Sequence, residues 1–83
     1  MKNGSHKAMW WMVQYEETKG NYREAYTLAK ELYLHRNIDA TMYLAGCFLH
    51  GKGVDRDRRL AKDLYREAAK AGNSEAKRIL EEW

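Results

Sequence analysis

The sequence, which has 83 residues, aligns with itself when it is shifted by 36 positions. A fixed period of this size is typical of stacked helical hairpins, in which each unit buries its apolar face only against its neighbours. The repeat therefore predicts a helical array. The matching pairs are Ala25–Ala61, Leu28–Leu64, Asn37–Asn73, Asp39–Glu75, Ala40–Ala76 and Leu44–Leu80.

Apolar residues recur at helical spacing in five segments, about 5–18, 22–35, 38–50, 57–71 and 74–83. In the first segment the predicted apolar stripe consists of Ala8, Met9, Trp11, Met12 and Tyr15. No segment alternates with period two, so no sheet is expected. The predicted fold is an all-α solenoid of two antiparallel helical hairpins (about 5–36 and 37–72) and a C-terminal capping helix (73–83), in a single domain spanning 1–83.

The predicted joints between helices have suitable turn and cap residues. Glycine closes helix C-termini because it adopts the left-handed conformation, and Gly20, Gly51 and Gly72 stand where helices should end. Asn and Asp side chains accept bonds from the free N–H groups at helix starts. We expect this role for Asn21, Asn37, Asp57 and Asn73, with Asn21 and Glu24 forming a capping box.

Charge and cysteine content limit the function classes. The net charge is +3, from 15 basic and 12 acidic residues that are interleaved, which is a weak signal for nucleic acid. The single cysteine cannot form an internal disulfide, which favours a reducing compartment, and we expect the cytoplasm. No apolar run approaches the roughly 18 residues of a membrane span, so no membrane association is expected.

The stretch HGKGVDRDRR, from His50 to Arg59, raises the question of a phosphate-binding loop. Such a loop needs Gly-x-x-x-x-Gly-Lys-Ser/Thr between a strand and a helix, and neither the spacing nor the preceding amphipathic segment fits. We interpret it as a tight turn with Val54 between the two helices of a hairpin. An anion at the N-terminus of the following helix stays open as an alternative.

The second half of the chain resembles a Sel-1-like repeat, a branch of the tetratricopeptide superfamily. The matching residues are Ala40, Leu44, Phe48, Gly51-x-Gly53-Val54, Asp57, Ala61, Leu64-Tyr65, Ala68-Ala69, Gly72-Asn73 and Ala76. Two positions depart from the family pattern, with Ala45 where Gly is usual and Asp55 where Pro is common. Residues 19–32 resemble the second helix of an ordinary tetratricopeptide hairpin. The resemblance implies an α-solenoid that acts as an adaptor for proteins or peptides, without catalysis.

The resemblance also implies that the first helix of each hairpin lines a concave groove. The expected groove residues are Trp10, Gln14, Met42, Gly46, Leu49, His50, Arg78 and Glu82. Trp, Met and Arg are common interface anchors. The alternative is that Trp10 and Met42 belong to the core, and the sequence leaves open whether Trp10 or Trp11 faces inward.

Other side chains were weighed as chemical sites. Cys47 and His50 are three residues apart, but no third group is evident to orient a catalytic pair. The histidines fall on separate segments, so neither a metal nor another cofactor is expected, and the protein is not predicted to be an enzyme. A basic patch is conceivable at Arg56, Arg58, Arg59, Lys62 and Arg66. We interpret it instead as a solvated helix face, because acids are interleaved and Arg59 can pair with Asp63.

Three functions follow, in order of preference. The first is a protein-binding module that takes a peptide or protein surface into the groove. The second is a small inhibitor or immunity-type protein that blocks one enzyme, and the third is nucleic-acid binding through the basic helix. A homodimer that hides Trp83 or Trp10 stays open, as does the question whether the chain is complete or part of a longer array.

Overall fold

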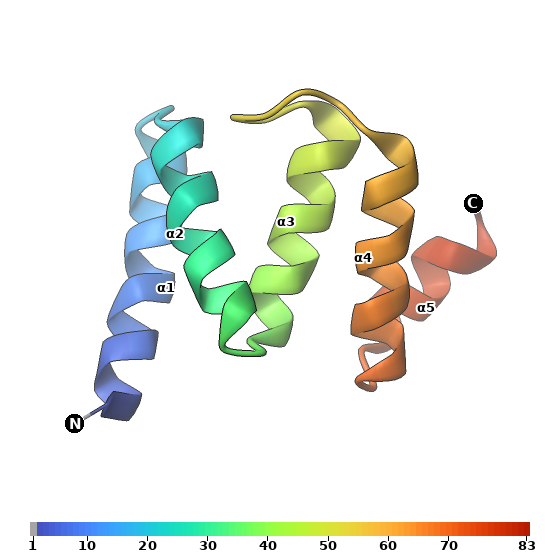
Figure 1. Cartoon of the computed structure of the whole chain (residues 1–83), viewed down its shortest axis with the longest axis horizontal. Helices are drawn as coiled ribbons and strands as arrows, with labels where there is room; N and C mark the ends of the chain where they lie inside the picture. The colour runs from blue at the N-terminus through green and yellow to red at the C-terminus, as the bar shows by residue number, and fades with distance from the viewer. Residues whose placement is uncertain (1) are drawn as a thin grey trace.

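The computed structural model describes the backbone of residues 2–83 and the side chains of residues 8–83. Over this range the chain forms helices and no strand, which confirms the all-α prediction (Figure 1). None of these helices is both long enough and apolar enough to cross a membrane. The helices are α1 (Lys2–Thr18), α2 (Tyr22–Leu34), α3 (Ile38–His50), α4 (Arg58–Lys70) and α5 (Ser74–Glu81).

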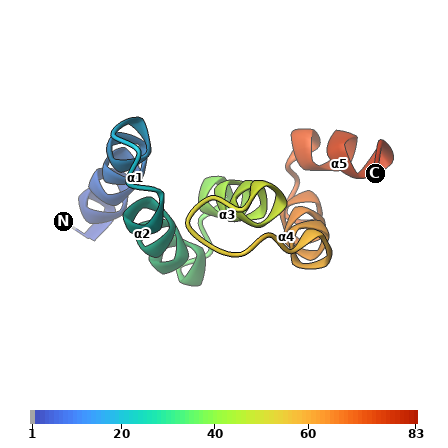
Figure 2. The same ribbon diagram turned by 90° about the horizontal axis from the view of Figure 1, so that it is seen from above.

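The helices pack in chain order as antiparallel neighbours, α1 with α2 and α3 with α4, and α5 follows (Figure 1). Seen from above, α1, α3 and α5 lie on one side of the stack, while α2 and α4 lie on the other (Figure 2). This arrangement is two hairpins and one further helix. The first helices of the two hairpins, α1 and α3, therefore lie on the same face of the molecule. This is the face on which the groove was expected.

The 36-residue repeat is reproduced in the burial of the side chains. Small buried residues at matched positions let neighbouring helices approach closely, and larger apolar side chains fill the space between them. The repeat therefore determines which face of α2, α4 and their neighbours is inside. The pairs buried at both positions are Ala25–Ala61, Ala29–Tyr65, Leu32–Ala68 and Ala40–Ala76.

The predicted N-caps are formed at three of the four joints. The side chains of Asn37 and Asn73 accept hydrogen bonds from the backbone N–H groups of Ala40 (2.9 Å) and Ala76 (2.8 Å), so the repeat extends to cap geometry. Asp57 caps α4 in the same way, through the N–H of Leu60.

The capping box predicted at Asn21 is wrong. Its side chain makes no cap bond, and its amide donates instead to the Glu16 carboxylate at 2.8 Å. The reason is local. Asn21 has ψ 68°, whereas the backbones of Asn37, Asp57 and Asn73 are extended, with ψ 117°, 93° and 114°.

The turn that ends α2 contains a feature that the sequence did not indicate. Gly20, Gly51 and Gly72 have positive φ as expected, but the same role after α2 is taken by Arg36, with φ 64°. The N–H of Arg36 bonds to the Tyr33 carbonyl (2.9 Å), as in glycine-closed helix ends. A non-glycine residue in this region is strained.

Most of the predicted apolar stripe of α1 is wrong, although Met9 does pack against the core. Val13 is fully buried and Trp10 is partly buried, whereas Trp11, Met12 and Tyr15 are 62%, 41% and 45% exposed. Trp11 is thus the outward tryptophan, stacked on Tyr15 with the ring centroids 5.3 Å apart. The physical reason is that α1 packs mainly on one neighbour, α2, so only a narrow face of it is covered.

Some helix bounds and stripe positions also differ from expectation. α1 begins at Lys2 rather than Ser5, and α5 ends at Glu81 rather than Trp83. Several large apolar side chains are exposed because they lie near helix ends, where fewer neighbours pack. These are Tyr22, Ile38 and Leu60.

Candidate functional site

A cavity of about 210 Å³ lies between α1 and α3, on the face shared by the first helices of the hairpins. One wall comes from the last turn of α1, the floor comes from α3, and the end is closed by the residue that follows Gly51. We call it the α1–α3 groove. Its lining residues are Glu17, Met42, Tyr43, Gly46, Cys47, His50 and Lys52.

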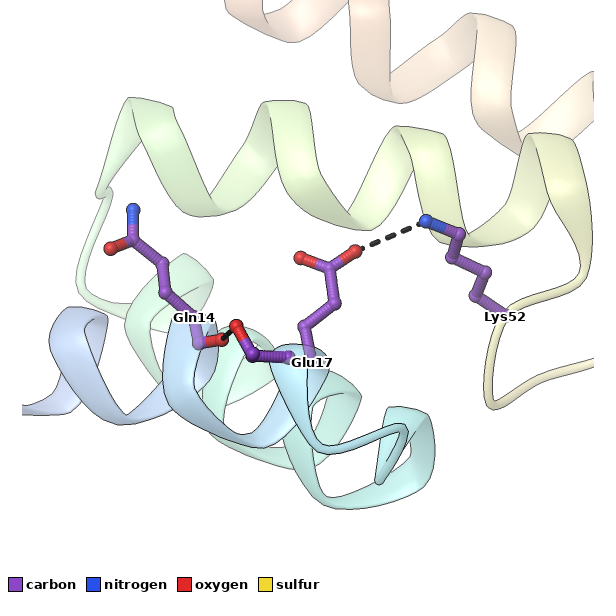
Figure 3. Close-up of polar contacts among 4 residues, drawn as sticks. Gln14, Glu17 and Lys52 are labelled. Carbon is purple, nitrogen blue, oxygen red and sulfur yellow. Dashed lines mark hydrogen bonds and ion pairs between the residues drawn. The ribbon is translucent and has the colours of Figure 1, made fainter.

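An ion pair spans the groove. The Lys52 ammonium donates to the Glu17 carboxylate at 3.1 Å, and Lys52 also lies over the Tyr22 ring, 5.4 Å from its centroid. The hydrogen bond to Glu17 raises the pKa of Lys52 above its usual value. Figure 3 shows Glu17 and Gln14 extending from α1 toward α3, with Lys52 meeting Glu17 from the other side. The pair links the first hairpin to the segment that follows α3, residues 51–57, which we call the corner.

The floor of the groove is open above Gly46. A Cβ atom added there would have no neighbour within 4 Å. Met42 and His50 lie one helical turn to either side of Gly46 and line the same cavity. The groove can therefore receive a side chain from outside without any movement of α3.

Two titratable groups beneath the groove are buried. The Tyr43 hydroxyl is buried beside the Cys47 thiol, and burial raises the pKa of Tyr43 well above its usual value. Burial also raises the pKa of the Cys47 thiol to about 11. Cys47 is therefore a neutral thiol at pH 7 and lacks the thiolate character that a nucleophile requires.

The structure places the predicted groove residues in different surroundings. Met42, Gly46 and His50 line the α1–α3 groove. Trp10 lies beside it, edge-to-face against Tyr43 with the ring centroids 6.1 Å apart. The remaining predicted residues lie outside its lining: Gln14 is exposed on α1, Leu49 packs against the core, and Arg78 and Glu82 are exposed near the end of α5.

Four lining residues were missed by the sequence analysis, namely Glu17, Tyr43, Cys47 and Lys52. Glu17 is one helical turn from Gln14 and Tyr43 is next to Met42, so the correct face of each helix would have included them. No helical spacing in the sequence indicated that Lys52 would line the groove. Its contact with Glu17 joins residues 35 positions apart through the folding of the corner.

The corner itself packs against the first hairpin. A Cβ at Gly53 would lie 2.6 Å from the carbonyl oxygen of Tyr22, and φ there is +75°. Val54 is half-buried and lines a cavity of about 590 Å³ together with Tyr26 and Thr27 of α2. The glycines thus serve a turn and a close approach, as the turn interpretation requires. Asp57 occupies the N-terminus of α4, so an anion there would meet its carboxylate.

The predicted basic patch is partly engaged within the chain. The Arg58 guanidinium lies over the Trp83 ring, 5.0 Å from its centroid, and Arg66 lies 4.0 Å from the Asp63 carboxylate. The predicted pair between Arg59 and Asp63 does not form, because Asp63 turns toward Arg66 instead. The other members are the exposed Arg56 and Arg59 and the half-buried Lys62.

Among residues 8–83 no group of three or more His, Cys, Asp or Glu side chains is placed to hold a metal ion. Comparison of the chain with protein families, with curated proteins and with solved structures found no match. The α1–α3 groove, with its apolar floor and polar rim, is suited to holding a side chain of another molecule.

Proposed function

We propose that the protein is a non-catalytic binding module, similar to Sel-1-like repeat adaptors, that takes a segment of another protein into the α1–α3 groove. The observation that carries the proposal is the open space above Gly46, flanked by Met42 and His50. The 36-residue repeat and the stacked hairpins support the kinship. The free thiol of Cys47 fits a reducing compartment, and we place the protein in the cytoplasm.

The size of the groove favours a peptide side chain over a small molecule. Small-molecule sites usually enclose about 300–1,000 Å³, whereas the α1–α3 groove has about 210 Å³. That volume holds one side chain, with the rest of the partner lying along the surface. The lining offers polar groups to the partner's backbone, namely the Glu17 carboxylate and the His50 imidazole.

The proposal is tested by filling the groove. Gly46→Trp places a large side chain in the open space, where its Cβ meets no atom within 4 Å. The 83-residue chain and the variant are each used as bait in cell extracts, and bound proteins are quantified by mass spectrometry. We expect a protein retained by the wild type to fall at least tenfold with Gly46→Trp.

The matched control is Lys70→Trp, which adds the same side chain at an exposed position near the end of α4. Retention should be unchanged with this variant, and circular dichroism should show both variants folded. Equal retention on all three baits would contradict the proposal. If the retained protein is an enzyme, its activity with and without the bait separates an inhibitor from an adaptor.

A further inference from the structure

The outward side of α1 gathers exposed apolar side chains at one end of the stack. Trp11, Met12 and Tyr15 are exposed within five residues, and no other helix carries three exposed large apolar side chains within residues 8–83. Figure 2 shows α1 at the end of the stack opposite α5. We call the surface formed by these three side chains the α1 outer face. None of them lines the α1–α3 groove, so the two surfaces are separate.

The aromatic side chains of the α1 outer face form one unit with a lysine. The Trp11 and Tyr15 rings are stacked, with an interplanar angle of 9°, and the Lys19 ammonium lies over the Tyr15 ring, 5.1 Å from its centroid. Trp and Tyr combine an apolar ring with a polar tip, and Lys combines an apolar stem with a charged head. These residue types are typical of helices that lie between the headgroups and the acyl chains of a bilayer.

Lysines precede and follow the apolar side chains. Residues 1–15 contain two lysines and no acidic residue, and Lys7 stands one helical turn before Trp11 in the sequence of α1. Lys19 follows Tyr15 by one turn and is exposed. Positions 7, 11, 15 and 19 are spaced by four residues, which is the spacing of neighbours on one side of a helix.

The acidic residues of α1 lie in its last turn and are engaged within the fold. Glu17 pairs with Lys52 across the α1–α3 groove at 3.1 Å, and the half-buried Glu16 accepts a hydrogen bond from the Asn21 amide at 2.8 Å. With both acids counted in full, residues 1–19 still hold three lysines against two glutamates. The surroundings of the α1 outer face are therefore positive, which favours an anionic cover.

The shape and the ring contacts favour a bilayer among the anionic covers. A nucleic-acid base stacks on an open aromatic ring, whereas Tyr15 is already stacked on Trp11 and covered by Lys19. A second copy of the chain would bring the same lysines face to face across a two-fold axis. A protein partner would need a groove that fits the convex helix, whereas a bilayer needs none.

From this arrangement we infer that the α1 outer face binds the surface of a bilayer that contains anionic lipid. Trp11, Met12 and Tyr15 enter the boundary between headgroups and acyl chains, while the lysines remain at the level of the headgroups. The expectation of no membrane association rested on the lack of a spanning run, and a helix that lies along the surface needs no such run. Anionic phosphatidylserine is found in the cytoplasmic leaflet, which fits the compartment proposed above.

The test is co-sedimentation of the 83-residue chain with vesicles of phosphatidylcholine, either pure or mixed with phosphatidylserine. We expect binding to the mixed vesicles to be at least tenfold stronger and to weaken as sodium chloride is added, because salt screens the lysines. Trp11→Gln should lower binding to the mixed vesicles at least tenfold with little change in melting temperature, since the side chain is exposed. Lys19→Gln should lower it at least threefold.

The matched controls remove the same kinds of side chain elsewhere. Leu34→Gln removes an exposed apolar side chain at the end of α2, and Lys70→Gln removes an exposed cation at the end of α4. Both should bind the mixed vesicles as the wild type does, and so should Gly46→Trp, because the α1–α3 groove is not involved. Absence of binding by the wild type, or equal losses with Leu34→Gln and Trp11→Gln, overturns the inference.

The same variants identify other occupants of the α1 outer face. A dimer that forms without lipid in analytical ultracentrifugation and dissociates with Trp11→Gln would assign this face to a second copy of the chain. Binding of oligouridine that is lost with Trp11→Gln, without binding to vesicles, would assign it to nucleic acid. Either result overturns the inference.

Discussion

At the scale of single residues, Gly53 holds the corner after α3 against the first hairpin. It combines a positive φ with a close approach to the Tyr22 carbonyl, while Gly20 has a positive φ with open space around it. These two glycines therefore separate two physical effects. Backbone conformation alone requires glycine at position 20, and both conformation and contact require it at position 53.

Gly53→Ala should destabilise the protein by about 2–4 kcal/mol, because strain and an overlap with backbone add together. Gly20→Ala should cost only about 1 kcal/mol, from the backbone conformation alone. Urea denaturation followed by circular dichroism measures both. Equal losses of unfolding free energy for the two variants would show that a Cβ at position 53 makes no steric clash with Tyr22.

Cys47 makes stability depend on alkaline pH. Burial raises its pKa in the folded state from 9.0 to about 11, so the folded chain holds the proton more tightly than the unfolded chain. This contribution is complete below pH 9 and is lost as the pH rises to about 11. The raised pKa of Tyr43 acts in the same direction from about pH 10 upward.

The free energy of unfolding should thus fall by on the order of 2 kcal/mol between pH 9 and pH 11. Cys47→Ala should show a shallower decline over this range, although it is less stable at neutral pH because it leaves a small cavity. Urea titrations in a phosphine reductant, at intervals across the range, provide the measurement. Parallel curves for the two proteins would rule out the thiol as the source.

At the scale of helices, the N-cap predicted from the sequence forms at some joints and fails at one. Asn37 and Asn73 bond to the N–H groups of Ala40 and Ala76, while Asn21 is turned back toward Glu16. Residue type is the same at all three positions. The backbone N–H groups of all three residues close the preceding helix, so the difference lies in the backbone of Asn21, whose ψ is 68° rather than 117° or 114°.

Asn37→Ala and Asn73→Ala should each cost about 1 kcal/mol of unfolding free energy, since a helix N-terminus loses its acceptor. Asn21→Ala should cost less than about 0.5 kcal/mol, because only an exposed side-chain contact is removed. Thermal and urea unfolding of the three variants under one set of conditions would reveal the difference. A larger loss at Asn21 than at Asn73 would reverse the assignment of the caps.

At the scale of the whole molecule, one ion pair connects the two hairpins across the candidate groove. Lys52 and Glu17 are 3.1 Å apart, with side chains 41% and 32% exposed. Arg66 and Asp63 form a pair at 4.0 Å with side chains 60% and 56% exposed, within a single helix. The first pair is shorter and less solvated, so it should contribute more to the stability of the stack.

A double-mutant cycle with Glu17→Gln and Lys52→Met should give a coupling energy of about 0.5 kcal/mol at low ionic strength. The coupling should shrink as sodium chloride is added, because salt screens partly exposed charges. The same cycle on Asp63 and Arg66 should give a smaller value. Zero coupling between Glu17 and Lys52 at low salt would mean that the link across the groove has no energetic role.

The stack as a whole was largely predictable, and the reason is the repeat. Matched alanines such as Ala25 and Ala61 specify the buried faces of α2 and α4, and the fold follows from them. The face of α1 was not predictable, because adjacent Trp10 and Trp11 fit two different stripes and only tertiary packing selects between them. Part of the groove was found through Met42, Gly46 and His50, whereas Lys52 reaches it only after the corner has formed.

The repeated junctions have a practical consequence for engineering. Arg36 and Gly72 both adopt positive φ, and each is followed by an asparagine that starts the next helix. A duplicate of residues 37–72 spliced in after Gly72 would therefore begin and end on matching geometry. The molecule would lengthen by one helical hairpin, with the same packing between hairpins. The number of inserted hairpins would then set the distance between the two ends of the molecule.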